Sequence, residues 1–411
     1  MVEETNNNNF PREWEIVNLN NDDYFKIVMG QSPPSSTYNY DKNGLPFLQG
    51  KAEFGSKFPD PFLYCSKPIK IAKKDSILLS VRAPVGDVNI ANSKTCIGRG
   101  LLAIEINKIK LNNIFIFYYL NFIKKQISSF SSGSTFKSIT KNELKRIKIL
   151  IPDLIEQEKI AEILSTVDNL IEETDVSITK TERFKKGLMQ KLLTKGIGHK
   201  EFKETEIGLI PKEWEIKKII DLFDIKTGTT PSTSKKEYWN EGTVNWITPS
   251  DMSKINGKLL IEQSERKITE KGLKEAGLNI LPVNSIIIST RAPVGYIVVV
   301  QNRTTFNQGC KGLMPKNLKI INSLFYAYCL LSKKKLLENY SSGSTFKELS
   351  KKALEEFLIP FPPINEQEKI AEILSTVDMR LQLFKEKKQK LQRIKKGLMN
   401  NLLTGKIRVK A

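Results

Sequence analysis

The chain has 411 residues, which is enough for two or three domains with hydrophobic cores. It carries 65 Lys and Arg against 45 Asp and Glu, a formal net charge of +20. Such an excess favours a polyanion partner such as nucleic acid, although a composition that is lysine-rich throughout would give the same value.

The scarce residue types exclude several kinds of site. His199 is the one histidine, which excludes a histidine triad and a multi-histidine metal site. It lies in a Gly- and Lys-rich stretch and is expected to be an inert surface residue. Cys65, Cys96, Cys310 and Cys329 form no CxxC pair, so neither zinc nor disulfides are expected.

Nothing in the chain predicts a membrane or secreted protein. No apolar run is long enough to cross a bilayer, and the acidic, Asn-rich start is not a secretory signal. We expect a cytoplasmic protein that has no membrane partner, no metal and no cofactor of its own.

The first 150 residues read as a mixed domain of short strands and a helix. Strands are expected at Phe47-Leu48, at 75–81 and at 87–91, with the turn Arg82–Gly86 between the last two. A helix is expected at 113–127, and its many aromatic residues are expected to pack in the core rather than stack on bases.

A long helix follows, beginning after Pro152-Asp153. Its apolar residues are spaced alternately by three and four positions, the pattern of a coiled-coil seam, and are Ile160, Ile163, Val167, Leu170, Phe184 and Leu188. From Glu156 to Leu193 it would measure roughly 57 Å at 1.5 Å per residue. The middle positions Thr174, Ser177 and Thr181 weaken the seam.

The second half of the chain repeats the first. SSGSTFK at 131–137 recurs at 341–347, and EQEKIAEILSTVD at 156–168 recurs unchanged at 366–378, both at an offset of 210 (347 − 137 and 378 − 168). KKGLM at 185–189 recurs at 395–399, and RAPVG at 82–86 recurs at 291–295. The offset between matching residues of the two halves is smaller near the start of each half. Insertions that distinguish the two copies are therefore expected in the first part of each half.

The repeat predicts equivalent elements in the second half. Strands are expected at Trp246-Ile247, 284–290 and 296–301, a helix at 322–337, and a second long helix after Pro362-Pro363. The seam of that helix is cleaner and comprises Ile370, Ile373, Val377, Phe384, Leu391, Ile394 and Leu398.

The predicted fold is α+β with internal pseudo-two-fold symmetry. Two similar globular domains, 1–152 and 197–361, are expected to be separated by two long helices, 153–196 and 362–411, that pair as an antiparallel coiled coil. A rod of that length compares with the ~34–36 Å repeat of B-DNA and would act as a ruler between two sites.

The order of elements and several motifs resemble the specificity subunit of type I restriction–modification systems. The entry into the second helix, Ile359–Asp378, looks like the family's hallmark; Ile151–Ile160 is a first copy two residues shorter and without the double proline. Gly228–Ser232, Trp246–Asp251, RAPVG and SSGSTFK are similar to its recognition-domain motifs. The resemblance covers essentially the whole chain.

The resemblance implies a subunit without catalytic activity. Such a subunit binds double-stranded DNA together with two modification subunits, which methylate adenine with S-adenosylmethionine, and with ATP-dependent restriction subunits. Each recognition domain would read one half of a bipartite target, and the helices would set the gap and dock the modification subunits.

Two other functions stay open from the residues alone. One is a methyltransferase or nuclease with its own catalytic site; the other is a coiled-coil adaptor with two protein-binding domains. The chain has no Gly-rich methyl-donor loop, no Asn-Pro-Pro-Tyr-like tetrad and no phosphate-binding P-loop, which disfavours the first.

If the two domains read different sequences, the base-reading residues must lie where the copies differ. The divergent stretches are Gln31–Phe58 and Thr229–Glu270, and their candidate donors to base edges are Gln31, Gln49, Lys51, Lys235, Lys236, Asn245 and Arg266. The residues shared by both copies are candidates for phosphate contacts or for structural roles, namely Arg82, Arg291, Ser134, Thr135, Lys137, Ser344, Thr345 and Lys347.

Overall fold

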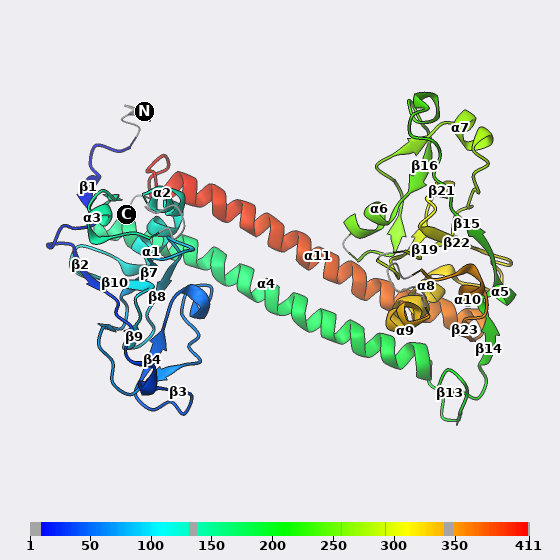
Figure 1. Cartoon of the computed structure of the whole chain (residues 1–411), viewed down its shortest axis with the longest axis horizontal. Helices are drawn as coiled ribbons and strands as arrows, with labels where there is room; N and C mark the ends of the chain where they lie inside the picture. The colour runs from blue at the N-terminus through cyan, green and yellow to red at the C-terminus, as the bar shows by residue number, and fades with distance from the viewer. Residues whose placement is uncertain (1–9, 131–137, 256, 292, 341–347, 410–411) are drawn as a thin grey trace. The chain divides into compact units, whose positions relative to one another are not determined.

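The computed structural model of the 411-residue chain describes residues 10–130, 138–255, 257–291, 293–340 and 348–409 (Figure 1). Contacts divide the chain into two compact units. Unit 1 is Met1–Asp175 with Glu386–Ala411, and unit 2 is Val176–Lys385. Each unit therefore contains one globular part and a segment of each long helix.

Unit 1 has two main sheets. A four-stranded antiparallel sheet has the order β2-β10-β7-β8, with bounds Phe25–Met29, Leu101–Ile106, Ile77–Ser80 and Val88–Ile90. A second sheet has the order β3-β5-β4-β9-β6, with bounds Tyr38–Asn39, Tyr64–Cys65, Leu45–Leu48, Thr95–Ile97 and Ile71–Ala72. β1 (Glu15–Asn18) pairs with β11 (Lys148–Ile151).

Unit 2 repeats this plan. Its larger sheet has the order β15-β22-β19-β20-β17, with bounds Phe223–Thr227, Cys310–Pro315, Ile286–Ser289, Ile297–Val300 and Leu260–Ile261. A smaller sheet is β18-β16-β21, with bounds Lys267–Ile268, Val244–Ile247 and Thr304–Phe306. Two short pairs remain, β14 (Glu215–Lys218) with β23 (Leu358–Phe361) and β12 (Phe202–Lys203) with β13 (Ile210–Pro211).

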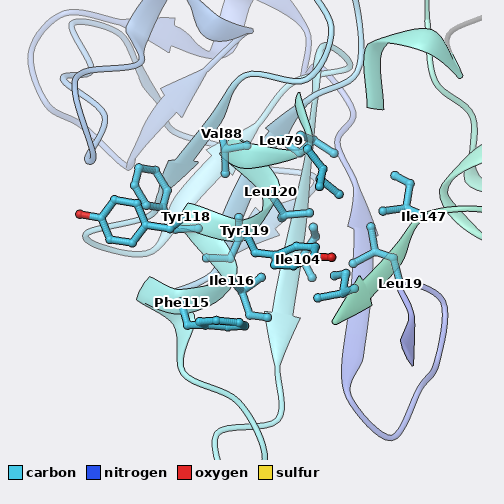
Figure 2. Close-up of a cluster of buried hydrophobic side chains, with 14 of the residues drawn as sticks. Leu19, Leu79, Val88, Ile104, Phe115, Ile116, Tyr118, Tyr119, Leu120 and Ile147 are labelled. Carbon is cyan, nitrogen blue, oxygen red and sulfur yellow. The ribbon is translucent and has the colours of Figure 1, made fainter. Parts of the chain in front are cut away.

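The central sheet of unit 1 is buried on both faces, which explains its continuous apolar strands. Ile77 and Leu79 of β7 pack with the main core on one face, whereas Leu78 between them packs with a second cluster on the other. The main core is completed by the helix α1 (Asn113–Phe122), which lies against β7 and β8 (Figure 1). Figure 2 shows side chains of α1 packed among side chains of the sheet and those of Leu19 and Ile147.

The aromatic residues of this helix and of its repeat, α8 (Ser323–Ser332), are core residues, as the sequence predicted. Tyr118 and Tyr326 are among the largest fully buried side chains. The predicted helices are each interrupted: α1 ends before α2 (Lys124–Ser129), and α8 before α9 (Lys334–Asn339). The shorter helices are α3 (Lys141–Leu144), α5 (Ile219–Leu222), α6 (Pro249–Lys254), α7 (Glu270–Glu275) and α10 (Lys351–Glu355).

The long helices are α4 (Leu154–Lys195) and α11 (Ile364–Leu402). Within each unit their segments lie side by side and run antiparallel (Figure 1). In unit 1, Asp168 pairs with Lys395 at 2.6 Å and Asp175 with Lys388 at 2.5 Å. Residue numbers therefore decrease along α11 as they increase along α4, as in an antiparallel pair. In unit 2, Lys185 pairs with Asp378 at 2.6 Å.

The identical EQEKIAEILSTVD segments share a set of contacts through their glutamine and their final aspartate. In unit 1, Gln157 is fully buried and its amide nitrogen donates to the carbonyls of Pro152 and Lys110, while its oxygen accepts from the backbone of Asn112. Asn112 is the N-cap of α1, so the glutamine joins the start of the long helix to the start of the core helix. The hydroxyl of Tyr118 then donates to Asp168 at 2.7 Å.

Unit 2 has the same bonds at the repeated positions. Gln367 bonds to Pro362, Ile320 and Asn322, and Tyr328 donates to Asp378 at 2.7 Å. The identity of the two segments therefore follows from a shared docking network, at the centre of which a fully buried glutamine needs its backbone partners.

The glutamate before each glutamine anchors a returning segment. In unit 1, Glu156 is 3% exposed and accepts from the indole of Trp14 and from Arg408 near the end of the chain. The predicted C-terminal helix, 362–411, is therefore too long: α11 ends at Leu402 and the tail returns to Glu156.

In unit 2, the equivalent Glu366 accepts from Trp214 at 2.9 Å and from His199 at 2.9 Å. The other ring nitrogen of His199 faces Glu213, and the histidine side chain is only 13% exposed. The expectation of an inert surface histidine is wrong, because this residue occupies in unit 2 the place that Arg408 takes in unit 1.

Candidate DNA-binding surface

Several strands of unit 1 end together at one edge, where four backbone hydrogen bonds hold the connections. The turn Gly98–Gly100 joins β9 of one sheet to β10 of the other. Gly30 donates to the carbonyl of Leu101 at 2.9 Å, Gln31 to Ile97 at 3.0 Å, Gly98 to Leu48 at 2.8 Å and Val81 to Gly100 at 2.9 Å. We call this the strand-end edge; it comprises Gly30–Gln31, Gln49–Gly50, Val81–Arg82 and Gly98–Gly100.

The strand-end edge of unit 2 is held by the same four bonds. Gly228 donates to Cys310 at 3.2 Å, Thr229 to Phe306 at 3.1 Å, Asn307 to Ile247 at 2.9 Å and Thr290 to Gly309 at 2.8 Å. It comprises Gly228–Thr229, Thr248–Pro249, Thr290–Arg291 and Asn307–Gly309. The two edges are thus superposable frames, and their residues can be matched position by position.

Close backbone approach explains one shared residue type. A Cβ atom on Gly30 would lie 2.2 Å from the carbonyl oxygen of Gly98, and one on Gly228 would lie 2.0 Å from that of Asn307. Any larger residue would push the turn away from the neighbouring strand. Gly228, the first residue of the Gly228–Ser232 motif, therefore allows the close backbone approach that holds the strand-end edge together.

In unit 1 the structure brings three sequence candidates together at this edge. All three are exposed: Gln49 directly follows β4, Gln31 follows β2 after Gly30, and Arg82 follows Val81. Lys51 is engaged elsewhere, since its ammonium group lies 3.0 Å from Asp87, which also pairs with Lys124 at 2.6 Å. Burial alone would raise the pKa of Asp87, but hydrogen bonds from the two lysines outweigh it and the pKa lies below its usual value.

In unit 2 the candidates separate into exposed and structural residues. Asn245 is 6% exposed, and its amide donates to the carbonyl of Glu262 at 2.8 Å, so it is engaged within the domain rather than offered at the surface. Lys235 donates to the hydroxyl of Tyr238 at 2.9 Å, which raises the pKa of the lysine. Lys236 is exposed at the start of a short 3-10 helix.

Arg266 is exposed but fixed by aromatic rings. Its guanidinium carbon lies 3.7 Å from the ring centre of Trp239 and 5.4 Å from that of Trp246. Trp246 donates from its indole to the carbonyl of Thr229 on the strand-end edge at 3.1 Å. The stack therefore holds a planar cation beside the edge with little freedom to reorient.

The shared arginines differ in their surroundings. Arg291 pairs with Glu348 at 3.2 Å, whereas the residue equivalent to Glu348 in unit 1 is Ser138, which forms a backbone bridge with Arg82. The remaining candidates, Ser134, Thr135, Lys137, Ser344, Thr345 and Lys347, lie outside the described residues.

Two edge residues escaped the sequence interpretation. Arg99 and Gln308 are exposed at the middle of the turns Gly98–Gly100 and Asn307–Gly309. Both lie outside the divergent stretches; the residues before them, Gly98 and Asn307, differ, and only the glycines after them, Gly100 and Gly309, match. The constant offset of 209 from RAPVG (291 − 82) was the signal that could have aligned them.

The described part of the chain contains no group of three or more His, Cys, Asp or Glu placed to hold a metal ion. Its four cysteines are free and buried. None of the helices within the described ranges combines the length and apolar character needed to cross a bilayer.

Comparison with known proteins gives a separate match for each of the two repeats of the chain. The family model described as type I restriction modification DNA specificity domain matches residues 11–180 and again residues 211–393. A putative type I restriction enzyme MjaX specificity subunit of Methanocaldococcus jannaschii is 54% identical over 184 residues, covering 45% of this chain and 43% of that protein. The MjaIX specificity subunit is 41% identical over 201 residues, covering 49% of this chain and 46% of that protein.

These two matches span less than half the length of either relative. The MjaVIII specificity subunit of the same organism matches along nearly the whole chain, at 29% identity over 97% of this chain and 94% of that protein. Neither alternative left open by the residues, a catalytic DNA enzyme or a protein-binding adaptor, is supported by these similarities.

Solved structures agree on the fold. The S subunit of a type I restriction–modification system from M. genitalium has a TM-score of 0.64 at 19% identity and covers 96% of this chain and 97% of its own. A structure from work on complex assembly and conformational transition of the type I system has a TM-score of 0.57 at 18% identity, covering 97% of this chain and 99% of its own. With the family model matching most of both repeats, the chain belongs to the family of type I restriction–modification DNA specificity proteins.

Proposed function

We propose that this chain is the DNA sequence-recognition subunit of a type I restriction–modification complex and has no catalytic centre of its own. Each unit's globular domain would read one half of a bipartite double-stranded target. The long helices would set the spacing and dock two modification subunits, and restriction subunits would complete the complex. Such a subunit would act in the cytoplasm, on DNA.

The observation that carries the proposal is the pair of matching strand-end edges. Four equivalent hydrogen bonds hold the backbone in the same form in both units, while several side chains at matching positions on that backbone differ. Gln31 corresponds to Thr229 and Gln49 to Thr248. A protein that reads two different half-sites needs one backbone arrangement with different side chains. Phosphate contacts from that shared backbone arrangement orient the domain, and base contacts select the sequence.

The candidates divide by role on this surface. Arg82 is exposed and free of ion pairs among the described residues, so it is assigned to a phosphate. Arg266 is assigned to a base edge, because a guanidinium held flat by an indole offers its donors in one plane. Gln31 and Gln49 offer amides that suit adenine.

Docking of partners is assigned to apolar residues that the helices leave uncovered. Phe184 on α4 in unit 2 is 60% exposed, and Ile394 at the repeated position on α11 in unit 1 is 51% exposed. Both belong to the predicted seam, yet the neighbouring helix does not cover them. Two equivalent apolar positions, one in each unit, suit two copies of the same partner.

The decisive test is methylome mapping by single-molecule sequencing. Cells with this gene and its modification partner are expected to carry one bipartite methyladenine motif, and deletion of this gene alone should remove that motif everywhere. The proposal is wrong if methylation is unchanged in the deletion while the modification partner is expressed.

A domain exchange tests the assignment of one domain to one half-site. Residues 1–150 are replaced by the matching domain of another specificity subunit, and the motif is mapped again. One half of the motif should change and the other should stay. A change in both halves would contradict the assignment, and an exchange of residues 197–361 provides the reciprocal control.

A further inference from the structure

The two strand-end edges differ at a position that neither the repeat motifs nor the divergent stretches include. Leu101 pairs with Ser80 in unit 1, and Cys310 pairs with Ser289 in unit 2, so these two registers align the turns that precede them. Arg99 and Gln308 therefore occupy equivalent positions in the two edges, since Arg99 lies two residues before Leu101 and Gln308 two residues before Cys310.

Both turns are fixed from several sides. In unit 1, Gly98 and Gly100 bond to two neighbouring strands, Leu101 donates back to Gly98 at 3.0 Å, and the backbone of Arg99 donates to the hydroxyl of Ser32 at 3.2 Å. In unit 2, Cys310 donates back to Asn307 at 3.0 Å, and Gly309 donates to the Asn307 side chain at 2.9 Å. The backbone beneath the two side chains is therefore preorganised.

The side chains themselves are exposed and uncommitted. Neither Arg99 nor Gln308 has a side-chain hydrogen bond or ion pair with any other residue in the described ranges, although both lie at the edge that carries Arg82 and Arg291. Neither side chain therefore has a polar partner to stabilise within the described part of the chain. Arginine and glutamine instead share the ability to form two hydrogen bonds to one base edge: arginine donates both to guanine, and glutamine donates one to adenine and accepts the other from it.

We infer that Arg99 and Gln308 are equivalent specificity-determining residues, Arg99 reading a guanine in the half-site of unit 1 and Gln308 an adenine in the half-site of unit 2. The inference rests on the proposed function and adds the position and the base class. It also places base-reading residues outside the divergent stretches, in the part of each repeat where the spacing is constant.

The test uses the full chain with its modification partner and exchanges the two residues. Arg99→Gln and Gln308→Arg are made singly and together, with Arg12→Gln as a matched control, because Arg12 is exposed and lies before β1, outside the edge. Methylated motifs are mapped in cells, and duplexes enriched by the purified complex from a random pool are sequenced, so that binding is measured apart from methylation.

Arg99→Gln is expected to lower discrimination by about 5- to 150-fold at one base pair of one half-site, with the other half unchanged. Gln308→Arg should do the same at one base pair of the other half, and the double variant should show both changes. The unchanged half-site reports that the complex is folded. Arg99→Lys should keep the guanine, because lysine donates to the same edge.

Two results would overturn the inference while leaving the proposed function intact. A uniform loss of binding to all duplexes would assign the two residues to phosphates, and an unchanged motif together with unchanged binding would exclude contact with DNA. If the unaltered chain confers no motif at all, the proposed function fails and this inference fails with it.

Discussion

At the scale of single residues, the chain shows how burial decides which polar groups are structural. Asn245 and Gln31 looked alike as amide donors in the sequence. The first is buried against a carbonyl and the second is exposed at a strand end. The type of residue could be read in advance, but exposure depends on the pairing of strands that are two to six residues long.

Asp87 offers a pH-dependent test of unit 1. Its carboxylate binds Lys51 and Lys124, and its pKa in the folded chain lies below the usual value of 3.8. A depressed folded pKa contributes stability that is complete above the unfolded pKa and is lost as the pH falls through the folded pKa. Asp87→Asn should lower the unfolding free energy by about 1 kcal/mol at pH 7, the two lysines being partly exposed.

The difference between Asp87→Asn and the unaltered chain should shrink as the pH is lowered from 5 and vanish below the folded pKa. Thermal unfolding followed across pH 2.5–7 measures it, and Asp41→Asn, at an exposed position, serves as the control at pH 7. A difference that persisted unchanged at the lowest pH would show that the ion pairs do not stabilise the fold.

Glu156 tests the anchoring of the tail. Its carboxylate accepts from Trp14 and Arg408, and from the backbone of Val409 at 3.1 Å. Glu156→Gln should cost about 2–4 kcal/mol, because the guanidinium loses its negatively charged partner and an NH2 group replaces one of the two acceptor oxygens. Hydrogen exchange of the peptide covering 403–409 should rise strongly.

The matched control is Glu158→Gln, because Glu158 is exposed on the same helix. Equal exchange of the 403–409 peptide in the two variants would mean that the carboxylate does not hold the tail.

At the scale of elements, the long helices were predictable and the sheets were only partly so. Spacing of three and four over many turns predicts a helix, and Pro152 and Pro362 mark the starts. The end of α11 at Leu402 was missed, although Gly405 just beyond it has a φ of +71° and is a local stop signal; the contact of Arg408 with Glu156 then holds the tail. The break between α1 and α2 was missed because neither Gly nor Pro marks it.

Gln157 and Gln367 test how the long helices attach to the domains. Each is 0% exposed and makes three hydrogen bonds to backbone groups. Gln157→Ala leaves buried carbonyls and an amide unpaired, at about 1–3 kcal/mol for each unsatisfied group. We expect the melting temperature of unit 1 to fall by several degrees, with Gln190→Ala, at an exposed site on the same helix, unchanged.

The repeat supplies an internal check on this prediction. Gln367→Ala should destabilise unit 2 by a similar amount, since its bonds are the same. Proteolysis read by mass spectrometry distinguishes the units. If Gln157→Ala and Gln190→Ala were equally stable, the glutamine would not join helix and domain.

At the scale of the whole molecule, the net charge of +20 and the two edges make separate contributions to DNA binding. Phosphate contacts release counterions, so the logarithm of affinity falls with the logarithm of salt at a slope of about −0.9 per phosphate. Base contacts add affinity for one sequence only.

Binding of the complex with its modification partner to the mapped target and to a scrambled duplex should therefore fall with salt at similar slopes, the target staying tighter throughout. Arg82→Gln should reduce both slopes by about 1, as expected for one lost phosphate, whereas Arg12→Gln should leave them unchanged. Fluorescence anisotropy between 50 and 300 mM salt provides the measurement. If the preference for the target vanished at high salt together with the nonspecific affinity, charge alone would account for binding, and the differing side chains on the two edges would have no part in reading the sequence.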